Sequence, residues 1–126
     1  MNILEVYYFR VLVPPESEAD LVESIVKVTP LPWGNYDRVT RLCSPEVIRC
    51  RPLSGANPNP LSPVHSDGNA DQDEMIQEGV VSVEFSIPRD DALLRSVIED
   101  GILPAHPHDE PGIFVFPALE TRRWER

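Results

Sequence analysis

The sequence lacks a long hydrophobic run, a cysteine framework and a secretory leader. No apolar stretch approaches the roughly 20 residues of a membrane-spanning helix, and the most apolar one, Ile3 to Val13, is interrupted by Glu5 and Arg10. Two cysteines, Cys43 and Cys50, are too few for a disulfide scaffold. No basic segment followed by a hydrophobic one begins the chain, so we expect a cytoplasmic protein with reduced thiols.

Positive charge is also scarce. The chain has 11 Lys and Arg against 21 Asp and Glu, a formal net charge of −10. A chain this acidic is repelled by nucleic-acid phosphates and by anionic membrane surfaces. We therefore expect neither nucleic acid nor a membrane as its partner.

Glycine is sparse and proline abundant, with 6 glycines and 14 prolines among 126 residues. The proline share is about twice the usual ~5%. Interior proline costs a helix ~3 kcal/mol, which excludes a plain helical bundle. The few glycines form neither a phosphate-binding loop nor a dinucleotide fingerprint. The length predicts one domain over residues 1–126, built from short elements.

Hydrophobic periodicity predicts the elements in chain order. A strand over 3–13 ends at Pro14 and Pro15, and a helix over about 16–28 follows, with Ser17 as its N-cap. Residues 38–43 and 47–53 form two short strands or one long bent strand with a bulge. Further along come a mobile acidic loop over about 59–78, a strand over 79–87, a helix over about 89–100 with Gly101 as C-cap, a strand over 113–116 and a polar tail over about 118–126.

The resulting order, β-α-β followed by β-α-β, predicts an α+β, ferredoxin-like fold. Its four-stranded antiparallel sheet would carry both helices on one face. The first strand is apolar on both sides. We therefore expect self-association, as a dimer or trimer, through the uncovered sheet face.

Three sequence blocks occur in an order that resembles a known family. They are Gly34-Asn35-Tyr36-Asp37, the block from Arg51-Pro52 through Gly55-Ala56-Asn57-Pro58, and Ala105-His106-Pro107-His108-Asp109-Glu110-Pro111. Together they resemble the domain inserted in many Nif3-like proteins of the YqfO type, and its stand-alone relatives. His108 and Asp109 depart from the family pattern, which has tyrosine and glutamate there.

The resemblance implies a ferredoxin-like, oligomeric domain similar to the PII and CutA proteins. The metal-binding, hydrolase-like site of Nif3 proteins lies in their other domains, so no such activity is implied here. The function that follows is a non-enzymatic ligand-binding or regulatory module. We expect its pocket at one end of the sheet, formed by the three blocks. The candidate ligand-binding residues are Gly34, Asn35, Tyr36, Asp37, Arg51, Gly55, Asn57, His106 and Glu110.

Two interpretations of the histidine-rich block stay open. Imidazole and carboxylate suit divalent first-row metals, so His106, His108 and Asp109 would bind such an ion, with His65 as a further ligand. Alternatively, His106 is a buried residue of a rigid turn that hydrogen-bonds to backbone. No nucleophile has a suitably spaced partner, so we predict no catalytic residue.

A local set of arginines carries the last hypothesis. Arg38, Arg41, Arg49 and Arg51 would bind a small anionic ligand, or would pair outward with nearby carboxylates. A small enzyme acting on an anionic metabolite is an alternative function. It requires these arginines and His106 to share one pocket. Trp33 is expected to be a packing residue.

Overall fold

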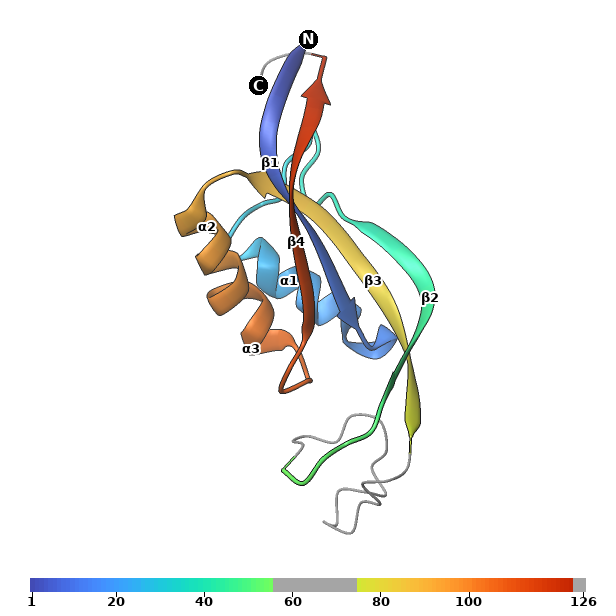
Figure 1. The fold of residues 1–126 in the computed structure, drawn as a ribbon. Coiled ribbons are helices and arrows are strands. Elements are labelled where there is room, and N and C mark those ends of the chain that lie inside the picture. Colours follow the sequence, from blue (N-terminus) through green and yellow to red (C-terminus); the bar gives the residue numbers. More distant parts are fainter. Residues whose placement is uncertain (56–74, 124–126) are drawn as a thin grey trace.

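The chain folds into one antiparallel sheet with its helices on one face (Figure 1). The computed structural model describes residues 1–55 and 75–123. The strands run in the spatial order β2-β3-β1-β4, which confirms the predicted α+β, ferredoxin-like fold. Their bounds are β1 (Asn2–Val13), β2 (Arg41–Cys50), β3 (Ile76–Pro88) and β4 (Gly112–Arg122).

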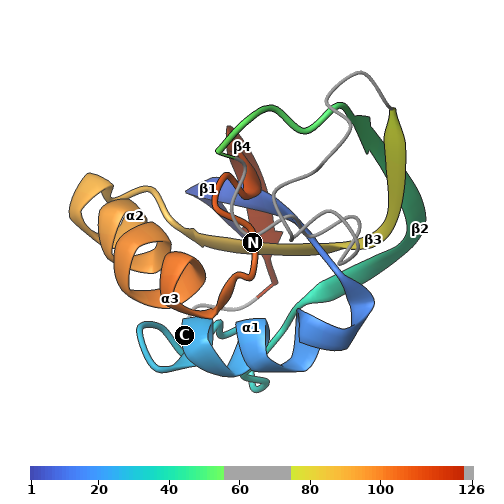
Figure 2. The ribbon, with the colours of Figure 1, turned by 90° about the horizontal axis from the view of Figure 1, so that it is seen from below.

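The helices lie together against one side of the sheet (Figure 2). A short 3₁₀ turn, η1 (Pro15–Ser17), leads into α1 (Glu18–Val26). The second helical segment is continuous and consists of α2 (Asp91–Ser96), the π-helical η3 (Val97–Ile102) and α3 (Leu103–Ala105). Among the described residues, no helix has both the length and the apolar composition needed to cross a bilayer.

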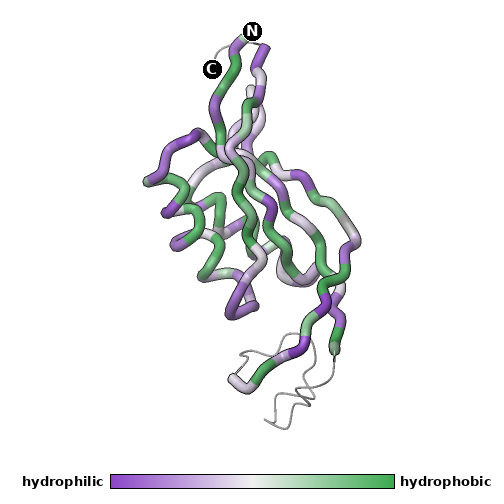
Figure 3. The backbone as a smooth tube through the Cα atoms, viewed as in Figure 1, coloured by the Kyte–Doolittle hydropathy of each residue, from purple (hydrophilic) through white to green (hydrophobic). Residues whose placement is uncertain are grey.

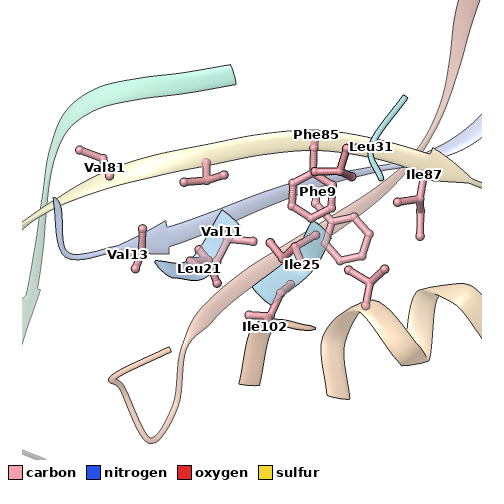
Figure 4. Packing of buried hydrophobic residues seen from close by; sticks show 12 residues of the cluster. Phe9, Val11, Val13, Leu21, Ile25, Leu31, Val81, Phe85, Ile87 and Ile102 are labelled. Atoms are coloured by element: carbon pink, nitrogen blue, oxygen red, sulfur yellow. The ribbon is translucent and has the colours of Figure 1, made fainter. Parts of the chain in front are cut away.

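The hydrophobic core fills the space between this sheet face and the helices (Figure 4). At its centre the rings of Phe9 and Phe85, from neighbouring strands, stack with centroids 4.7 Å apart. Burying a side chain of this kind stabilises the fold by about 1.5–3 kcal/mol. Strand alternation supplies the core, because odd-numbered residues of β1 and β3 face the helices. They are Phe9, Val11, Val13, Val81, Val83, Phe85 and Ile87.

The first helix begins later than predicted. Ser17 already has near-helical backbone angles, φ −103° and ψ −1°, and its side chain makes no capping hydrogen bond. The prediction that Ser17 caps the helix is therefore wrong, because a 3₁₀ turn after Pro14 leads into α1 without a side-chain cap. Asp90, by contrast, caps α2, since its Oδ1 accepts from the backbone N–H of Ala92 at 2.9 Å and of Leu93 at 3.1 Å.

Gly101 is not a C-cap, and that prediction was wrong. The helical path continues through it to Ala105. Gly101 is buried, and a Cβ placed on it would lie 3.3 Å from the Cα of Ile25. The glycine is needed because the two helices approach each other at this point. Ser24 Oγ donates across the same contact to the Gly101 carbonyl, at 2.6 Å.

The second strand is continuous, which confirms the alternative of one long strand with a bulge. The irregularity falls between Cys43 and Glu46. Both cysteines are free thiols on this strand. Strand β3 begins at Ile76, so the predicted loop over about 59–78 extends too far at its C-terminal end. Its remaining part lies mostly outside the described residues.

The last strand is longer than predicted and continues to Arg122, so a polar tail starting at residue 118 is wrong. Pro117, which lacks an N–H, does not end the strand. Strand β4 is an edge strand that pairs only with β1, and proline is tolerated on such strands.

Strands β1 and β4 extend together past the helices. In this part β1 still contains hydrophobic residues (Figure 3).

Candidate functional site

The three sequence blocks do not meet in one pocket. The Gly34 block lies where β1 begins, because Trp33 stacks on Arg122, which pairs with Asn2. The histidine block lies where β1 ends, because His106 hydrogen-bonds to Leu12. Ten residues of strand span roughly 33 Å. The predicted convergence of the blocks at one end of the sheet is therefore wrong.

The second block lies at the histidine end. Arg51 and Gly55 follow β2 away from the Trp33 turn (Figure 1). Gly34 and Gly55 have the positive φ angles, +59° and +93°, that favour glycine. Asn57 falls outside the described residues. The eight predicted ligand-binding residues that the structure describes thus divide between two ends of one sheet.

His106 is buried, and both of its ring nitrogens are hydrogen-bonded. Its Nδ1 accepts from the backbone N–H of His108 at 3.1 Å, so the ring proton is on Nε2 and is donated to the Leu12 carbonyl, 2.7 Å away. Burial lowers the pKa of His106, and the nearby His108 ring lowers it further. The neutral ring therefore ties the loop to the end of β1.

His108 makes the second attachment of this loop. Its Nε2 lies 3.0 Å from Oε1 of Glu78 on β3, and the two side chains are 7% and 13% exposed. Within the described part of the chain, neither atom has another hydrogen-bond partner. Burial lowers the pKa of His108 and raises that of Glu78. Both shifts favour the neutral forms, so this contact differs from a solvated surface ion pair.

The histidine end offers little to a metal ion in this conformation. Binding at either ring nitrogen of His106 would break one of its two hydrogen bonds. Within residues 1–55 and 75–123, no three His, Cys, Asp or Glu side chains are grouped so as to hold an ion. Asp109 and Glu110 are exposed, and His65 lies outside the described residues.

The opposite end of the sheet carries a cavity of about 690 Å³. It lies between the start of β1, the end of β3 and β4, and the turn before Asn35. Among the described residues, Gly34 is the one predicted site residue in its lining. The lining residues are Asn2, Ile3, Leu4, Glu5, Val6, Pro32, Gly34, Ser86, Ile87, Pro88, Glu120 and Arg122.

A chain of polar contacts forms one wall of this cavity. Ser86 Oγ donates to Glu120 Oε1 at 2.6 Å, and Arg122 Nη2 lies 2.6 Å from Glu120 Oε2. The Arg122 guanidinium in turn lies 3.7 Å from the centre of the Trp33 ring. Trp33 is 43% exposed and packs against Arg122, a contact that joins the turn to the end of β4.

A second polar network occupies the helix-free face of the sheet. Glu84 accepts from Tyr8 Oη at 2.6 Å and from Ser82 Oγ at 3.2 Å. Burial and the Glu84 contact raise the pKa of Tyr8 to about 12. Burial alone would raise the pKa of Glu84, but its hydrogen bonds outweigh that effect and lower it. Arg10 pairs with Glu46 across the intervening β3.

The arginine set and His106 do not share the cavity beside Gly34. None of Arg38, Arg41, Arg49 and Arg51 lines the cavity. Arg38 pairs with Glu23 at 2.6 Å. The shared pocket required by the anionic-metabolite enzyme hypothesis is therefore not formed by this cavity.

Sequence reasoning missed Glu78, Glu84, Glu120 and Arg122. The sequence predicts Glu78 in the loop over about 59–78, and Glu120 and Arg122 in the polar tail over about 118–126. A signal for Glu84 was present, since it alternates with buried residues along β3 and so had to face away from the helices. No such signal marks Glu120 and Arg122, because Pro117 suggests that the strand ends before it reaches them.

Comparison with known proteins supports the fold. No protein-family profile matches the chain, and no curated protein matches it significantly. Among solved structures it is similar to "The Crystal Structure of Bacillus cereus protein related to NIF3", with a TM-score of 0.67 and 20% identity. The match covers 94% of this chain and 27% of that one, so the chain spans about a quarter of its neighbour. This likeness shows a shared fold and agrees with the Nif3-like resemblance of the sequence.

Proposed function

We propose that this chain is a non-enzymatic small-ligand-binding module, related to the insert domain of the YqfO-type Nif3-like proteins and more distantly to PII and CutA proteins. The cavity beside Gly34 carries this proposal. Its volume, about 690 Å³, falls within the roughly 300–1,000 Å³ of small-molecule sites. Such sites have mostly apolar walls with a few polar groups, and this lining matches that description.

A titration with a small neutral probe tests the proposal. Benzamide is added to the ¹⁵N-labelled full chain, and amide chemical shifts are followed by NMR. We expect saturable shifts centred on the lining residues, such as Leu4, Gly34 and Ile87. Shifts that do not saturate, or that centre elsewhere, would contradict the cavity as the site.

Two variants sharpen this test. Leu4→Trp places a large ring in the cavity and should abolish the saturable shifts. Leu42→Trp is the matched control, because Leu42 is an exposed strand leucine that does not line the cavity. Leu4→Phe, a smaller enlargement at the same position, covers the case in which Leu4→Trp fails to fold. Equal binding by the Leu4 variants and the control would refute the proposal.

Self-association through the helix-free sheet face is a second proposal. Phe114 and Phe116 are 49% and 50% exposed. They alternate with Ile113 and Val115, which pack against the core, so they point to the opposite face. Two adjacent half-exposed phenylalanines on an uncovered face suit contact with a second copy.

Light scattering coupled to size exclusion tests this second proposal. The wild-type chain should elute as a dimer or trimer, and Phe116→Glu should elute as a monomer. Leu119→Glu is the control, because Leu119 is 66% exposed on the other side of the same strand. A monomeric wild type, or equal effects of both variants, would overturn it.

A further inference from the structure

Strand β1 has an unpaired edge at its N-terminal end. Its pairing with β3 extends only as far as Val6, opposite Pro88, whereas its pairing with β4 extends to Asn2. After Pro88 the chain turns away toward α2, and the Asp90 N–H donates to the Pro88 carbonyl at 2.8 Å. Among the described residues, the stretch 2–5 of β1 therefore has a neighbouring strand on one side only.

The backbone groups of Ile3 and Glu5 point toward this open edge. In an antiparallel sheet, successive residues of a strand direct their N–H and C=O groups to alternate neighbours. The Arg89 N–H donates to the Glu5 carbonyl at 3.2 Å, so the odd-numbered residues of β1 direct these groups to the β3 side. Within the described part of the chain, the Ile3 N–H, the Ile3 carbonyl and the Glu5 N–H form no backbone hydrogen bond. The edge thus offers two donors and one acceptor.

The cavity beside Gly34 lies along this edge. Its lining includes five consecutive residues of β1, from Asn2 to Val6. Side chains of consecutive strand residues alternate between the two faces of a sheet, so a cavity that contacts all five also contacts the backbone between them. Ile3 and Glu5 belong to the lining although both are largely exposed. The open backbone groups are therefore accessible from the cavity.

We propose, on the basis of the ligand-binding function above, that the cavity binds a short peptide in extended conformation, which pairs with β1 as an added antiparallel strand. Unpaired strand edges are templates for such pairing, and strand addition is a recurring mode of peptide recognition. One ligand residue lies opposite Ile3, and its N–H and C=O pair with the carbonyl and N–H of Ile3. The ligand residue two positions earlier lies opposite Glu5, and its carbonyl accepts from the Glu5 N–H.

The strand geometry also sets the side chain and the length that the edge prefers. The ligand residue between these two lies opposite Leu4, and its side chain shares the sheet face on which Leu4 and Val6 offer apolar contacts. At roughly 3.3 Å per residue, the four unpaired residues of β1 give the ligand about 13 Å of strand. Because backbone groups supply the contacts, the ligand needs no charge, unlike the small anionic ligand expected from the arginine set.

Two isomeric peptides test the strand pairing. Both are the methylamide of acetyl-Ala-Leu-Ala with one extra methyl group, placed on the nitrogen of either the leucine or the last alanine. The alanine isomer lacks the N–H that donates to the Ile3 carbonyl, whereas the N–H missing from the leucine isomer points to the other edge of the ligand. In the NMR titration of the full chain, we expect the leucine isomer to shift the lining residues saturably. The alanine isomer should bind about fivefold more weakly, the usual effect of one neutral hydrogen bond. Equal affinities, or shifts centred away from Ile3 and Glu5, would overturn the strand pairing.

A backbone variant tests the same contact from the protein side. Ile3→Pro removes the Ile3 N–H, and the pairing of β1 with β4 should survive because this N–H points away from β4. Ile3→Ala is the matched control, since it also shortens the side chain but retains the N–H. We expect Ile3→Pro to bind the leucine isomer about fivefold more weakly than Ile3→Ala does. Equal affinities of the two variants would contradict pairing at Ile3, and if Ile3→Pro does not fold, the two isomers on the wild-type chain decide.

The outcomes separate this inference from the function on which it rests. If benzamide binds the cavity and the two peptide isomers bind equally or not at all, only the peptide assignment fails. If no probe shifts the lining residues saturably, the ligand-binding function itself fails.

Discussion

The Nε2 atom of His106 donates a hydrogen bond to the carbonyl oxygen of Leu12, 2.7 Å away and 94 residues earlier in the chain. This bond attaches the loop after α3 to the C-terminal end of β1. The neighbouring contact of His108 with Glu78 attaches the same loop to β3. One short segment thus joins the second helical segment to two strands through two imidazoles.

This arrangement predicts that stability decreases on mild acidification. The pKa values of His106 and His108 in the folded chain lie below the ordinary 6.5. Their contribution is complete above pH 6.5 and is lost as pH falls toward the folded-state values, because the unfolded chain binds more protons there. The raised pKa of Glu78 has the opposite effect on stability above pH 4.5, because the folded chain there binds more protons than the unfolded chain. Urea unfolding from pH 8 to pH 5 measures the balance.

His106→Gln isolates the contribution of this ring. The variant should lose about 1–3 kcal/mol at pH 8, because the Leu12 carbonyl and the His108 N–H lose a well-placed partner. It should also flatten the dependence of stability on pH below 6.5, because the group that titrates there is gone. A pH dependence as steep as that of the wild type would contradict the assignment.

Gly101→Ala should destabilise the fold by about 1–3 kcal/mol, the usual cost of overpacking a core contact. The added methyl would lie 3.3 Å from the Ile25 backbone, which cannot move without shifting α1. Gly79→Ala is the control, because nothing lies within 4 Å of its added Cβ. Chemical denaturation compares the two, and equal midpoints would refute the close helix contact.

Asp90→Ala should cost about 1 kcal/mol, because it removes the acceptor for two N–H groups at the start of α2. Ser17→Ala should have almost no effect, since Ser17 makes no capping hydrogen bond. Thermal unfolding of both variants checks this difference. A larger loss for Ser17→Ala would restore the cap predicted from the sequence.

Glu84→Gln should lower the pKa of Tyr8 from about 12 part of the way toward 10.0. Burial, the largest cause of the shift, remains, while the charged acceptor is lost. A tyrosine ¹³Cζ titration by NMR measures this value, with Tyr8→Phe to assign the resonance. Glu23→Gln, which affects the distant Arg38 pair, should leave it unchanged. An unaltered value in Glu84→Gln would show that the two side chains are uncoupled.

The fold was predictable because its signals are local. Strict alternation from Val81 to Ile87 indicates a half-buried strand, and the proline pairs mark the ends of β1 and α1. The errors occurred where tertiary contacts override those signals. Gly101 has the position of a C-cap but lies at a close helix contact, and Pro117 has the appearance of a strand end but lies within the edge strand β4.

The candidate site was less predictable. Burial of His106 in a rigid turn was one of two open interpretations, and its two hydrogen bonds favour it. The cavity was not foreseen, because it depends on the register that places Leu4 opposite Glu120. No spacing along the chain encodes that pairing. Of the predicted ligand-binding residues that the structure describes, only Gly34 belongs to its lining.

The pairing of Asn2 with Arg122 brings the beginning and the end of the described fold to the same place (Figure 1). A domain whose ends are neighbours can be spliced into a loop of another protein, or have its ends joined and reopened elsewhere, without distorting its core. Asn2 and Arg122 both line the cavity. A host protein or affinity tag joined at these positions would therefore stand beside the cavity.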